Sequence, residues 1–480
     1  MRSAAVLILS VIVLAVPVQA VAHPALTSIP RPRFSISSLG STEWYFAEGY
    51  TGPGFHQYIT LLNASDDEAN LEVTYMTSGG PLPPSNHRVP ARSRYTILVN
   101  SDAGEGLELS ARLRSDLPLL AERPMYFDYQ GRYRGGHVGR GGQKTSPDWY
   151  FAEGYTGPGF DEYLTILNPN PFGCRLEVEY MLKGGGRIQR SHTVPAERRY
   201  TIRVNDDAGS GLELSAAVSA FREGAEPPEE AGVVVERPMY FLYSGIIDGG
   251  SVSLGSTELR NEWLFAEGCT GDFFYEYLTV MNPQDVDVGV RITYYTDDGP
   301  PDPREPIHVP AHGRETVMVN MEVGWGRNVS ARVEAELPVL AERPVYFHFL
   351  QGDLAVRGGD VALGSGAVSS WAAAEGYTGP GFREFLTILN RDSEDASVEV
   401  TYLLDDGSGI TKEYLVPAGS RYTVLVNGEV GEGRECGMVV QSRKKDEPGT
   451  PLPVTLERPM YFLYSGAWGG GHVSIGYAGT

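Results

Sequence analysis

One pattern of about 105 to 115 residues occurs four times along this chain, and this repetition limits the folds that are open to it. Each copy opens with Trp and reaches Ala-Glu-Gly three residues later, starting at Trp44, Trp149, Trp263 and Trp371. An apolar run ending in Asn, a Val-Pro-Ala turn, an Arg, a Glu-Arg-Pro segment and a closing Gly-Gly-X-Val then follow in the same order. A unit of this length is a domain rather than a solenoid repeat, so we expect four copies of one domain.

Alternation of apolar and polar residues predicts the secondary structure within a copy. Leu71–Met76 and Leu107–Arg114 alternate with period two, which is typical of strands with one buried face. Gly and Pro clusters interrupt these runs, and no segment has a convincing helical period. The sequence therefore predicts an all-β fold of four tandem antiparallel β-sandwich domains with about seven or eight strands each. The expected segments are a signal peptide at 1–22, an N-terminal linker at 23–40, and repeats at 41–143, 144–258, 259–366 and 367–480.

The first 22 residues resemble a secretory signal. Arg2 precedes the apolar run Ala4–Val16, and small residues follow, with cleavage expected after Ala20 or Ala22. A single membrane anchor is the alternative, but the apolar run is shorter than the roughly 20 residues that span a bilayer. We therefore expect a secreted or cell-envelope protein without a membrane span in the mature chain.

The net charge limits the expected partners, and the cysteine content limits how the domains are stabilised. The formal net charge is -22, and a surface this negative repels phosphate backbones, so nucleic acid is not an expected partner. The three cysteines, Cys174, Cys269 and Cys436, stand at non-equivalent places in three copies and form no disulfide framework. Each domain must then be stabilised by its own hydrophobic core.

Comparison of the copies argues against an enzyme. The Gly-Gly-X-Val slot contains His137, Ser251, Asp360 and His472, and a catalytic base does not tolerate such exchange. No cysteine position is shared, and no paired His or Cys spacing indicates zinc. We expect no catalytic residues and no cofactor. Calcium is a minor alternative, because the acidic turns Asn63–Glu68 and Asn205–Gly209 supply oxygen ligands without the spacing of an EF-hand.

Four charged positions per copy are shared by all copies. One interpretation is a structural ion pair near the sandwich edge, since partly buried charges need partners. The other is a ligand cleft, in which carboxylate and guanidinium groups bind sugar hydroxyls or a peptide terminus. We favour the structural interpretation. The residues are Glu48, Arg94, Glu122, Arg123, Glu153, Arg199, Glu236, Arg237, Glu267, Arg314, Glu342, Arg343, Glu375, Arg421, Glu457 and Arg458.

A Tyr-Thr-Gly-Pro-Gly-Phe loop follows the first strand of three copies. Its aromatic side chains either form a stacking platform for a sugar ring or fold back over the core while the glycines permit the turn. The third copy changes the loop to Cys269-Thr-Gly-Asp-Phe-Phe274, which favours packing over a strict binding site. The candidate loop residues are Tyr50, Phe55, Tyr155, Phe160, Tyr377 and Phe382.

The motifs Trp-Tyr-Phe-Ala-Glu-Gly-Tyr-Thr and Glu-Arg-Pro-Met-Tyr-Phe resemble tandem repeats in exported proteins of actinobacteria and related Gram-positive lineages. That resemblance covers almost the whole mature chain. The order of Trp, acidic-Gly, Leu-Asn and Val-Pro-Ala-x-x-Arg is more distantly similar to the sensory rhodopsin transducer family. This second resemblance implies a small β-sandwich, a tetramer in some members and a proposed ligand site. The export signal and tandem copies depart from that family, so a transducer role is not implied.

Three functions remain open from the sequence. The first is a cell-surface binding module for a cell-wall glycan or a surface protein. The second is a structural spacer or coat component of the cell envelope, and the third is an accessory chain to a separate cell-wall hydrolase. Exposed aromatic clusters would favour the first function, whereas burial of those aromatics and of Glu122 and Arg123 would favour the second. The sequence leaves open whether the copies form a line or a closed pseudo-fourfold ring.

Overall fold

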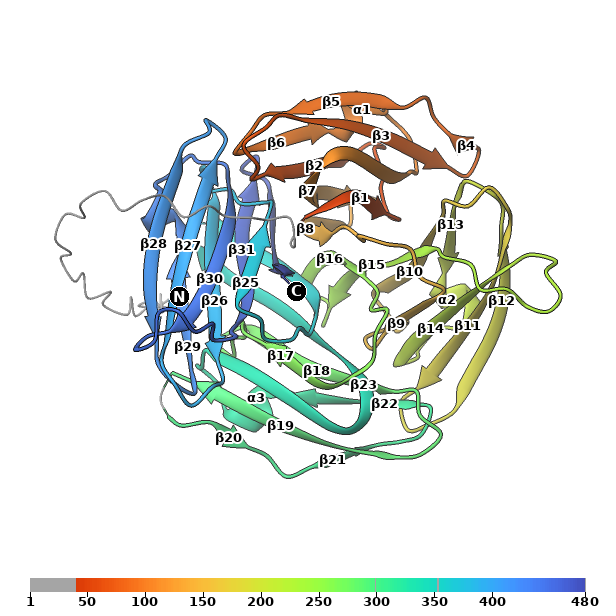
Figure 1. The fold of residues 1–480 in the computed structure, drawn as a ribbon. Coiled ribbons are helices and arrows are strands. Elements are labelled where there is room, and N and C mark those ends of the chain that lie inside the picture. Colours follow the sequence, from red (N-terminus) through yellow and green to blue (C-terminus); the bar gives the residue numbers. More distant parts are fainter. Residues whose placement is uncertain (1–39, 298, 352–353, 480) are drawn as a thin grey trace, which may run out of the picture. The chain divides into compact units, whose positions relative to one another are not determined.

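The computed structural model describes residues 40–297, 299–351 and 354–479, and residues 35–480 form one compact unit. The predicted signal peptide and most of the N-terminal linker lie outside the described residues. Within the described part of the chain, no helix is long and apolar enough to cross a membrane. The four repeats follow one another in colour from red to blue in Figure 1.

The strands and short helices recur in the same order in each repeat. Repeat 1 contains β1 (Ser41–Phe46), β2 (Phe55–Asn63), β3 (Ala69–Thr77), β4 (Gly80–Pro81), β5 (Ser85–Val89), β6 (Ser93–Leu98), α1 (Val99–Asp102), β7 (Ser110–Tyr129) and β8 (Tyr133–Arg140). Repeat 2 contains β9 (Asp148–Phe151), β10 (Phe160–Asn168), β11 (Cys174–Leu182), β12 (Arg187–Val194), β13 (Arg198–Arg203), α2 (Val204–Asp207), β14 (Leu214–Arg222), β15 (Val234–Tyr243) and β16 (Ile247–Leu254).

Repeats 3 and 4 have the same plan with different strand breaks. Repeat 3 contains β17 (Arg260–Phe265), β18 (Phe274–Asn282), β19 (Val288–Thr296), β20 (Asp302–Pro303), β21 (Ile307–Val309), β22 (Gly313–Met318), α3 (Val319–Val323), β23 (Val329–Gln351) and β24 (Leu354–Leu363). Repeat 4 contains β25 (Ser370–Ala373), β26 (Phe382–Asn390), β27 (Ala396–Leu404), β28 (Gly409–Val416), β29 (Ser420–Leu425), α4 (Val426–Val430), β30 (Cys436–Lys444), β31 (Thr455–Tyr464), β32 (Trp468–Ile475) and β33 (Tyr477–Ala478).

Each repeat is an antiparallel β-sandwich, which confirms the predicted fold class. In repeat 2 one sheet has the strand order β12-β11-β14-β9 and the other β13-β10-β15-β16. In repeats 1 and 3 a single long strand, β7 or β23, joins both sheets. The alternating segment that ends at Arg114 thus continues without a break to Tyr129 in β7. In repeats 2 and 4, residues 223–233 and 445–454 separate the corresponding strands into β14 and β15, and β30 and β31.

The opening Trp of each repeat anchors the sandwich core. The Trp44 ring is buried, and its Nε1 donates to the carbonyl oxygen of Leu119 at 2.9 Å. Trp149, Trp263 and Trp371 donate in the same way to the carbonyls at 233, 339 and 454. A buried indole needs such a partner, so the Trp both fills the core and bonds the first strand to the residue three positions before the Glu-Arg-Pro motif.

A single helical turn, α1, follows β6 and contains Asn100. The side chain of Asn100 accepts a hydrogen bond from the backbone N–H of Gln57 at 2.9 Å and donates to the carbonyl of Phe55 at 2.9 Å. These bonds hold the turn against β2, and the equivalent asparagines in repeats 2, 3 and 4 bond likewise. Local side-chain to backbone bonding of this kind favours a turn over a continued strand.

The last strands of the four repeats, β8, β16, β24 and β32, pack against one another in cyclic order, so that repeat 4 returns to repeat 1. A Cβ atom added at Gly249 would lie 3.1 Å from the Cα of Gly358, and one added at Gly470 would lie 3.2 Å from the backbone nitrogen of Gly136. Such close backbone contact requires glycine, which explains the Gly-Gly pair in the closing motif. The compact unit is therefore a closed ring of four repeats rather than a linear array.

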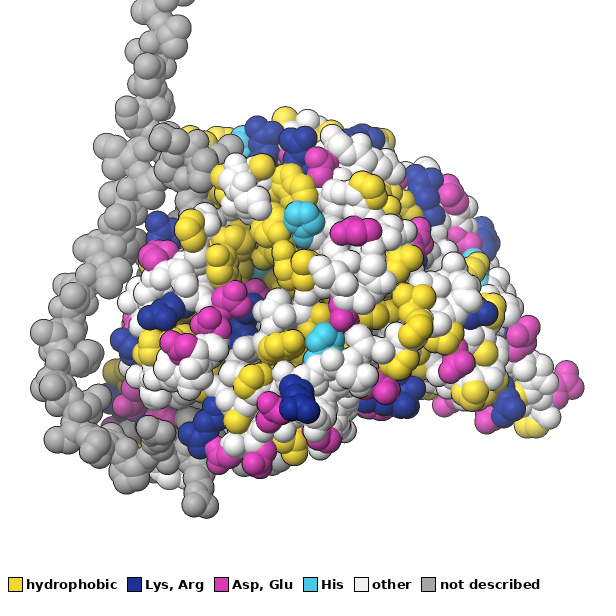
Figure 2. Space-filling model, turned by 90° about the horizontal axis from the view of Figure 1, so that it is seen from above, with side chains coloured by type: hydrophobic (Ala, Val, Ile, Leu, Met, Phe, Trp, Pro, Cys, Tyr) yellow, Lys and Arg dark blue, Asp and Glu magenta, His cyan; other side chains and the backbone are white. Residues whose placement is uncertain are grey.

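The surface of the unit mixes charges of both signs despite the net charge of -22. On the face shown in Figure 2, acidic and basic side chains are intermingled, and hydrophobic side chains gather in a patch that borders a histidine.

The three cysteines are free thiols, and Cys174 and Cys436 are buried.

Candidate functional site: charged nodes between the repeats

The sixteen shared charged residues come together in four equivalent clusters, one at each boundary between neighbouring repeats. We call each cluster a node. Each node joins the Ala-Glu-Gly glutamate and the Glu-Arg-Pro arginine of one repeat to the Glu-Arg-Pro glutamate and the Val-Pro-Ala-x-x-Arg arginine of the next. The nodes are Glu48, Arg123, Arg199 and Glu236; Glu153, Arg237, Arg314 and Glu342; Glu267, Arg343, Arg421 and Glu457; and Glu375, Arg458, Arg94 and Glu122.

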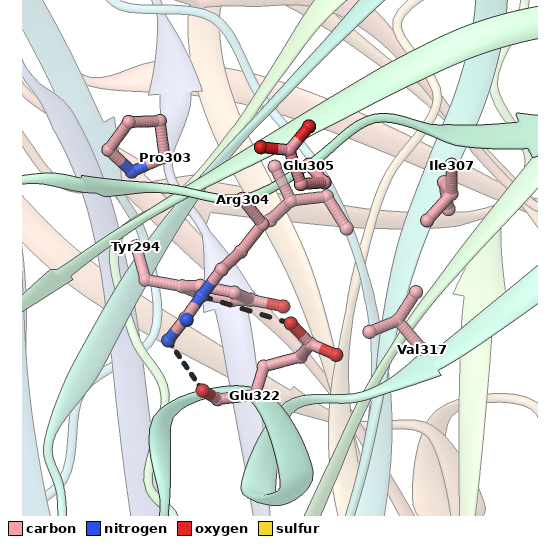
Figure 3. Close-up of a pocket in the computed structure, with 8 residues that line it drawn as sticks. Tyr294, Pro303, Arg304, Glu305, Ile307, Val317 and Glu322 are labelled. Atoms are coloured by element: carbon pink, nitrogen blue, oxygen red, sulfur yellow. Dashed lines mark hydrogen bonds and ion pairs between the residues drawn. The ribbon is translucent and has the colours of Figure 1, made fainter.

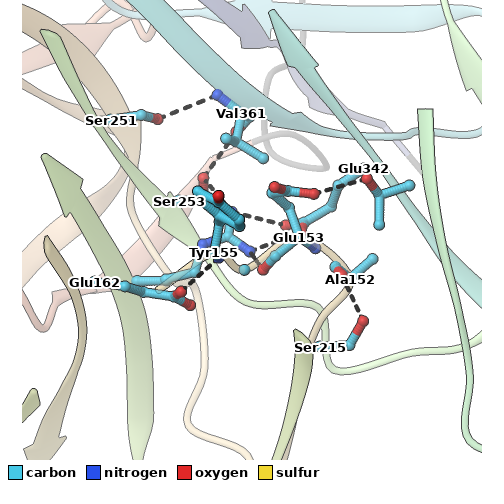
Figure 4. Close-up of polar contacts among 12 residues, drawn as sticks. Ala152, Glu153, Tyr155, Glu162, Ser215, Ser251, Ser253, Glu342 and Val361 are labelled. Carbon is cyan, nitrogen blue, oxygen red and sulfur yellow. Dashed lines mark hydrogen bonds and ion pairs between the residues drawn. The ribbon is translucent and has the colours of Figure 1, made fainter. Parts of the chain in front are cut away.

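The node between repeats 2 and 3 shows the geometry (Figure 4). Arg237 pairs with Glu342 at 2.8 Å, and Arg314 pairs with Glu153 at 2.7 Å. The backbone N–H of Glu153 donates to the Glu342 carboxylate at 2.6 Å, and the Thr279 hydroxyl donates to the Glu153 carboxylate at 2.7 Å. Each carboxylate therefore accepts its bonds from the neighbouring repeat, which links the two sandwiches through one buried network.

The other three nodes repeat these contacts across the remaining boundaries, including the one that closes the ring. The ion pair equivalent to Arg237–Glu342 has an N–O distance of 2.7 Å for Arg123–Glu236, 2.8 Å for Arg343–Glu457 and 3.3 Å for Arg458–Glu122. The second ion pair, equivalent to Arg314–Glu153, has an N–O distance of 2.8 Å for Arg199–Glu48, 3.3 Å for Arg421–Glu267 and 2.5 Å for Arg94–Glu375.

The Glu-Arg-Pro pair of each node is closed to solvent, whereas the second pair lies nearer the surface. In three nodes the arginine of the second pair also binds a partly exposed carboxylate, as Arg199 binds Glu108. Glu122 and Arg123 have no exposed surface, and Arg237, Glu342 and Glu457 have 1% or less. The guanidinium groups of Arg123, Arg237 and Arg343 also lie 5.4 to 5.6 Å from the ring centres of Phe46, Phe151 and Phe265. The sequence interpretation expected structural ion pairs near the sandwich edge, and the structure pairs each charge with a residue of the neighbouring copy.

The electrostatics of the nodes follow from this burial. Burial raises the pKa of Glu236 and of Glu457 despite the arginine beside each. Burial alone would lower the pKa of Arg237 and Arg458, but the carboxylates of Glu342 and Glu122 outweigh it and raise both values. The arginines therefore stay charged at all physiological pH values.

A fifth node member was missed by the sequence analysis. Glu162, Glu276 and Glu384 occupy one position in repeats 2, 3 and 4, and burial together with a neighbouring glutamate raises the pKa of each to about 8, against the opposing effect of a nearby arginine. Repeat 1 contains Gln57 at this position, where its side-chain oxygen accepts the Tyr50 N–H at 2.8 Å, as Glu162 accepts that of Tyr155. The Gln57 exchange is the sequence signal, since a neutral amide at this place in repeat 1 indicates that the position does not require a charge.

The loop aromatics pack into the same boundaries. Phe55, Phe160 and Phe382 are 7% exposed or less, whereas Tyr50, Tyr155 and Tyr377 are half-buried. Each of these tyrosines meets its own loop Phe edge to face, at 4.7 to 4.8 Å between ring centres. Each Phe also contacts a tyrosine of a neighbouring repeat, in the pairs Phe55–Tyr240, Phe160–Tyr346 and Phe382–Tyr126.

The variable slot of Gly-Gly-X-Val lies in the buried centre of the ring. Ser251 donates to Asp360 at 2.5 Å, and Asp360 accepts the backbone N–H of Val473 at 2.7 Å. Burial, with the charge of Arg123 or Arg458, lowers the pKa of His137 and His472 well below the usual value. The slot therefore contains a hydrogen-bonded Ser–Asp pair in repeats 2 and 3 and two buried histidines in repeats 1 and 4.

The acidic turns considered for calcium are organised by their asparagines. The Asn63 side chain is buried and donates to the carbonyls of Asp67 and Val89, and Asn205 bonds backbone groups of its own repeat. Across residues 40–297, 299–351 and 354–479, no group of three or more His, Cys, Asp or Glu side chains is placed to bind a metal ion.

No protein-family profile and no curated protein matches the chain. Among solved structures, the Anabaena sensory rhodopsin transducer matches with 31% identity over 18% of this chain and 97% of that chain, at a TM-score of 0.17. Thermotoga maritima 1070 matches with 16% identity over 23% of this chain and 96% of that chain, at a TM-score of 0.20. A tetra-tandem repeat from the extending region of a large adhesion protein matches with 10% identity over 87% and 92% of the two chains, at a TM-score of 0.11. This chain is thus similar in structure, over part of its length, to the transducer and to Thermotoga maritima 1070.

Proposed function

We propose that this chain is a secreted, non-enzymatic structural component of the cell envelope, a rigid ring made of four fused β-sandwich domains. The observation that supports this most is the use of all sixteen shared charges in contacts between repeats. Side chains that are buried in a domain boundary bind no external ligand, so their presence in every copy reflects ring assembly. The proposal also groups these repeats with the tandem repeats of exported proteins that contain the same Trp-Tyr-Phe-Ala-Glu-Gly-Tyr-Thr and Glu-Arg-Pro-Met-Tyr-Phe motifs.

Localisation in the host tests this function. Cells that express the full chain would be fractionated and the protein followed by antibody, and a deletion strain would be imaged by electron cryotomography. We expect the protein in the envelope fraction and a thinner or incomplete surface layer in the deletion strain. Recovery in the cytoplasm, or an unchanged envelope in its absence, would argue against a structural role.

A binding module for a glycan or surface protein is the second candidate, and repeat 3 favours it. Phe273 is 56% exposed and Trp325 is 48% exposed. Phe273 has a φ of 66°, a conformation that costs a non-glycine residue free energy, and the other repeats contain Gly54, Gly159 and Gly381 there. Strained, exposed aromatic side chains in only one repeat are typical of a recognition surface.

The sister repeats supply a binding test that leaves the fold intact. We would compare the full chain with a Phe273→Gly, Trp325→Glu variant in a pull-down with purified cell wall and a polysaccharide panel. Both replacements are residues that other repeats contain, since Glu105 and Glu432 stand where repeat 3 has Trp325. Loss of retention in the variant would support recognition through repeat 3, and equal retention of both proteins would exclude that surface.

A further inference from the structure

Three of the four repeats fill the same corner of the sandwich with a pair of aromatic rings. The pair joins the strand before the Val-Pro-Ala turn to the strand after it. Its ring centres are about 6 Å apart in each case, in the pairs His87–Tyr95, His192–Tyr200 and Tyr414–Tyr422. Repeat 3 has Ile307 and Glu315 at these two positions, so both rings are missing.

A cavity of about 490 Å³ lies at this corner of repeat 3 (Figure 3). Ile292, Ile307 and Val317 form its apolar wall, and Arg304, Glu305 and Glu322 provide its charges. This volume is within the range of small-molecule sites, and the mixture of an apolar wall with a few polar groups is typical of them.

A buried hydroxyl group in the cavity lacks the partner that its counterparts in repeats 1 and 2 have. There the equivalent tyrosines donate to an aspartate, Tyr75 to Asp102 at 2.7 Å and Tyr180 to Asp207 at 2.8 Å. Tyr294 lines the cavity and has no exposed surface, yet its hydroxyl, like that of the equivalent Tyr402 in repeat 4, has no hydrogen-bond partner among the described residues. In repeat 3 this unsatisfied hydroxyl borders an open volume, so it marks a place where a ligand atom would be stabilised.

The charge of the cavity restricts what binds there. Arg304 lies over the Tyr294 ring at 5.9 Å and is already bound: it donates to the Glu322 carbonyl at 2.5 Å and pairs with Asp302 at 3.0 Å and with one oxygen of the Glu322 carboxylate at 3.8 Å. The carboxylates of Glu305 and Glu322 therefore outnumber the one arginine. In repeats 1 and 2 the matching carboxylate faces an imidazole nitrogen, at 3.2 Å for both His87–Asp102 and His192–Asp207.

We propose that this cavity in repeat 3 binds a small, flat aromatic molecule that carries an amine or another N–H group. The ring of the ligand occupies the volume of the missing aromatic pair against Ile292, Ile307 and Val317. Its N–H group bonds the Glu322 carboxylate, as the histidines do in repeats 1 and 2, and the Tyr294 hydroxyl completes the polar contacts. Repeats 1, 2 and 4 do not bind this molecule because their own side chains fill the corner.

The test uses benzylamine as the probe and benzoate as an anion of similar size. Binding to the full chain would be followed by the NMR shifts of isoleucine methyl groups, which report on Ile292 and Ile307. We expect saturable shifts with benzylamine and binding of benzoate that is at least tenfold weaker. No saturable shift with benzylamine, or equal binding of the two probes, would overturn the proposal.

Two variants locate the site. Ile307→His with Glu315→Tyr rebuilds the aromatic pair of repeats 1 and 2 and should abolish benzylamine binding while the resistance to unfolding stays equal or rises. Tyr294→Phe should weaken benzylamine at least threefold without loss of resistance to unfolding, since its hydroxyl has no partner to lose. The matched Tyr75→Phe should lower that resistance and leave benzylamine binding unchanged. Unchanged affinity in the rebuilt variant would place the bound molecule elsewhere and disprove the assignment.

Discussion

At the residue scale, the nodes show why these charged residues occur in every repeat. A buried carboxylate is stable only with compensating donors, and an arginine supplies several donors in a fixed arrangement. The Glu342 carboxylate accepts hydrogen bonds from the Arg237 guanidinium and from the backbone N–H of Glu153. Removing Arg237 would therefore leave a buried negative charge without its counter-charge. The fifth position keeps the balance at two positive and two negative charges, because Gln57 is neutral and the carboxyls of Glu162, Glu276 and Glu384 are protonated at neutral pH.

Removal of a node arginine should destabilise the protein strongly. We expect Arg237→Gln to lower the free energy of unfolding by about 3–5 kcal/mol, because Glu342 then remains buried without its counter-charge. Chemical denaturation at pH 7 measures the change. Arg175→Gln is the control, since its pair with Glu177 is exposed and contributes less than about 1 kcal/mol. Equal losses for the two variants would contradict the importance of the nodes.

The protonated carboxyls predict a pH dependence with a definite sign. Glu162, Glu276 and Glu384 have a pKa of about 8 in the folded protein, against 4.5 as the ordinary value for the unfolded chain. The folded state therefore binds more protons between these values. The stabilisation is fully present below pH 4.5 and is lost as the pH rises through about 8, at up to about 1.4 kcal/mol per pH unit for each carboxyl.

Replacement of these carboxyls by the amide of repeat 1 tests the sign. Glu162→Gln should flatten the dependence of unfolding free energy on pH between 5 and 8, and the triple variant with Glu276→Gln and Glu384→Gln should flatten it further. Denaturant unfolding at several pH values measures the slope. The exposed Glu177→Gln serves as the control and should leave the slope as it is. A steeper fall with rising pH in the Gln variants would show that the assigned protonation is wrong.

At the element scale, the closing strands β8, β16, β24 and β32 determine how closely the sandwiches approach. The second glycine of each pair contacts a phenylalanine from the preceding repeat, for instance Gly250 with Phe127 and Gly359 with Phe241. The first glycine faces the backbone of the next strand. A side chain at either place would push two whole sheets apart, because backbone atoms cannot move aside as a flexible side chain can.

Gly358→Ala should therefore be costly. The added Cβ would lie 3.0 Å from the Phe347 ring and 3.3 Å from the Cα of Gly470, and overpacking of this kind costs about 1–3 kcal/mol. The melting temperature should fall accordingly. Gly428→Ala in α4 is the matched control, because a Cβ there meets open space and alanine is the better helix former. A Gly358→Ala variant with the same melting temperature as the wild type would mean that the contact between β24 and β32 has room for a Cβ atom.

At the scale of the whole molecule, the boundary between repeats 4 and 1 differs from the other three because no linker crosses it. Its node contains Arg458, Glu122, Arg94 and Glu375. The hydroxyl of Tyr477 in β33 adds a contact with repeat 1, where it donates to the Ala121 carbonyl at 2.7 Å and accepts the Gly141 N–H at 2.8 Å. The ring therefore closes only through noncovalent contacts at this boundary.

A charge reversal at this boundary should open the ring. Glu122→Arg places two arginines together at the closing node, and like-charge contact in a buried site is strongly unfavourable. We expect the radius of gyration from small-angle X-ray scattering to increase while circular dichroism still reports β structure. Glu457→Arg makes the same change between repeats 3 and 4, where the linker limits separation, and should expand the protein less. The same radius for both variants and the wild type would show that the nodes do not close the ring.

The sequence by itself determined the four repeats, the all-β sandwich class and which charged and aromatic residues matter, because period-two alternation and internal repetition are local properties of the chain. Only the tertiary structure decided that Glu122 pairs with Arg458 rather than with a group of its own repeat, and that Phe55 packs on Tyr240. Such partners lie more than a hundred residues apart, and identical motifs fit a linear array and a ring equally well. The cavity of repeat 3 was likewise invisible in the sequence, since the loss of two rings at Ile307 and Glu315 produces an open volume only where the strands around them do not collapse.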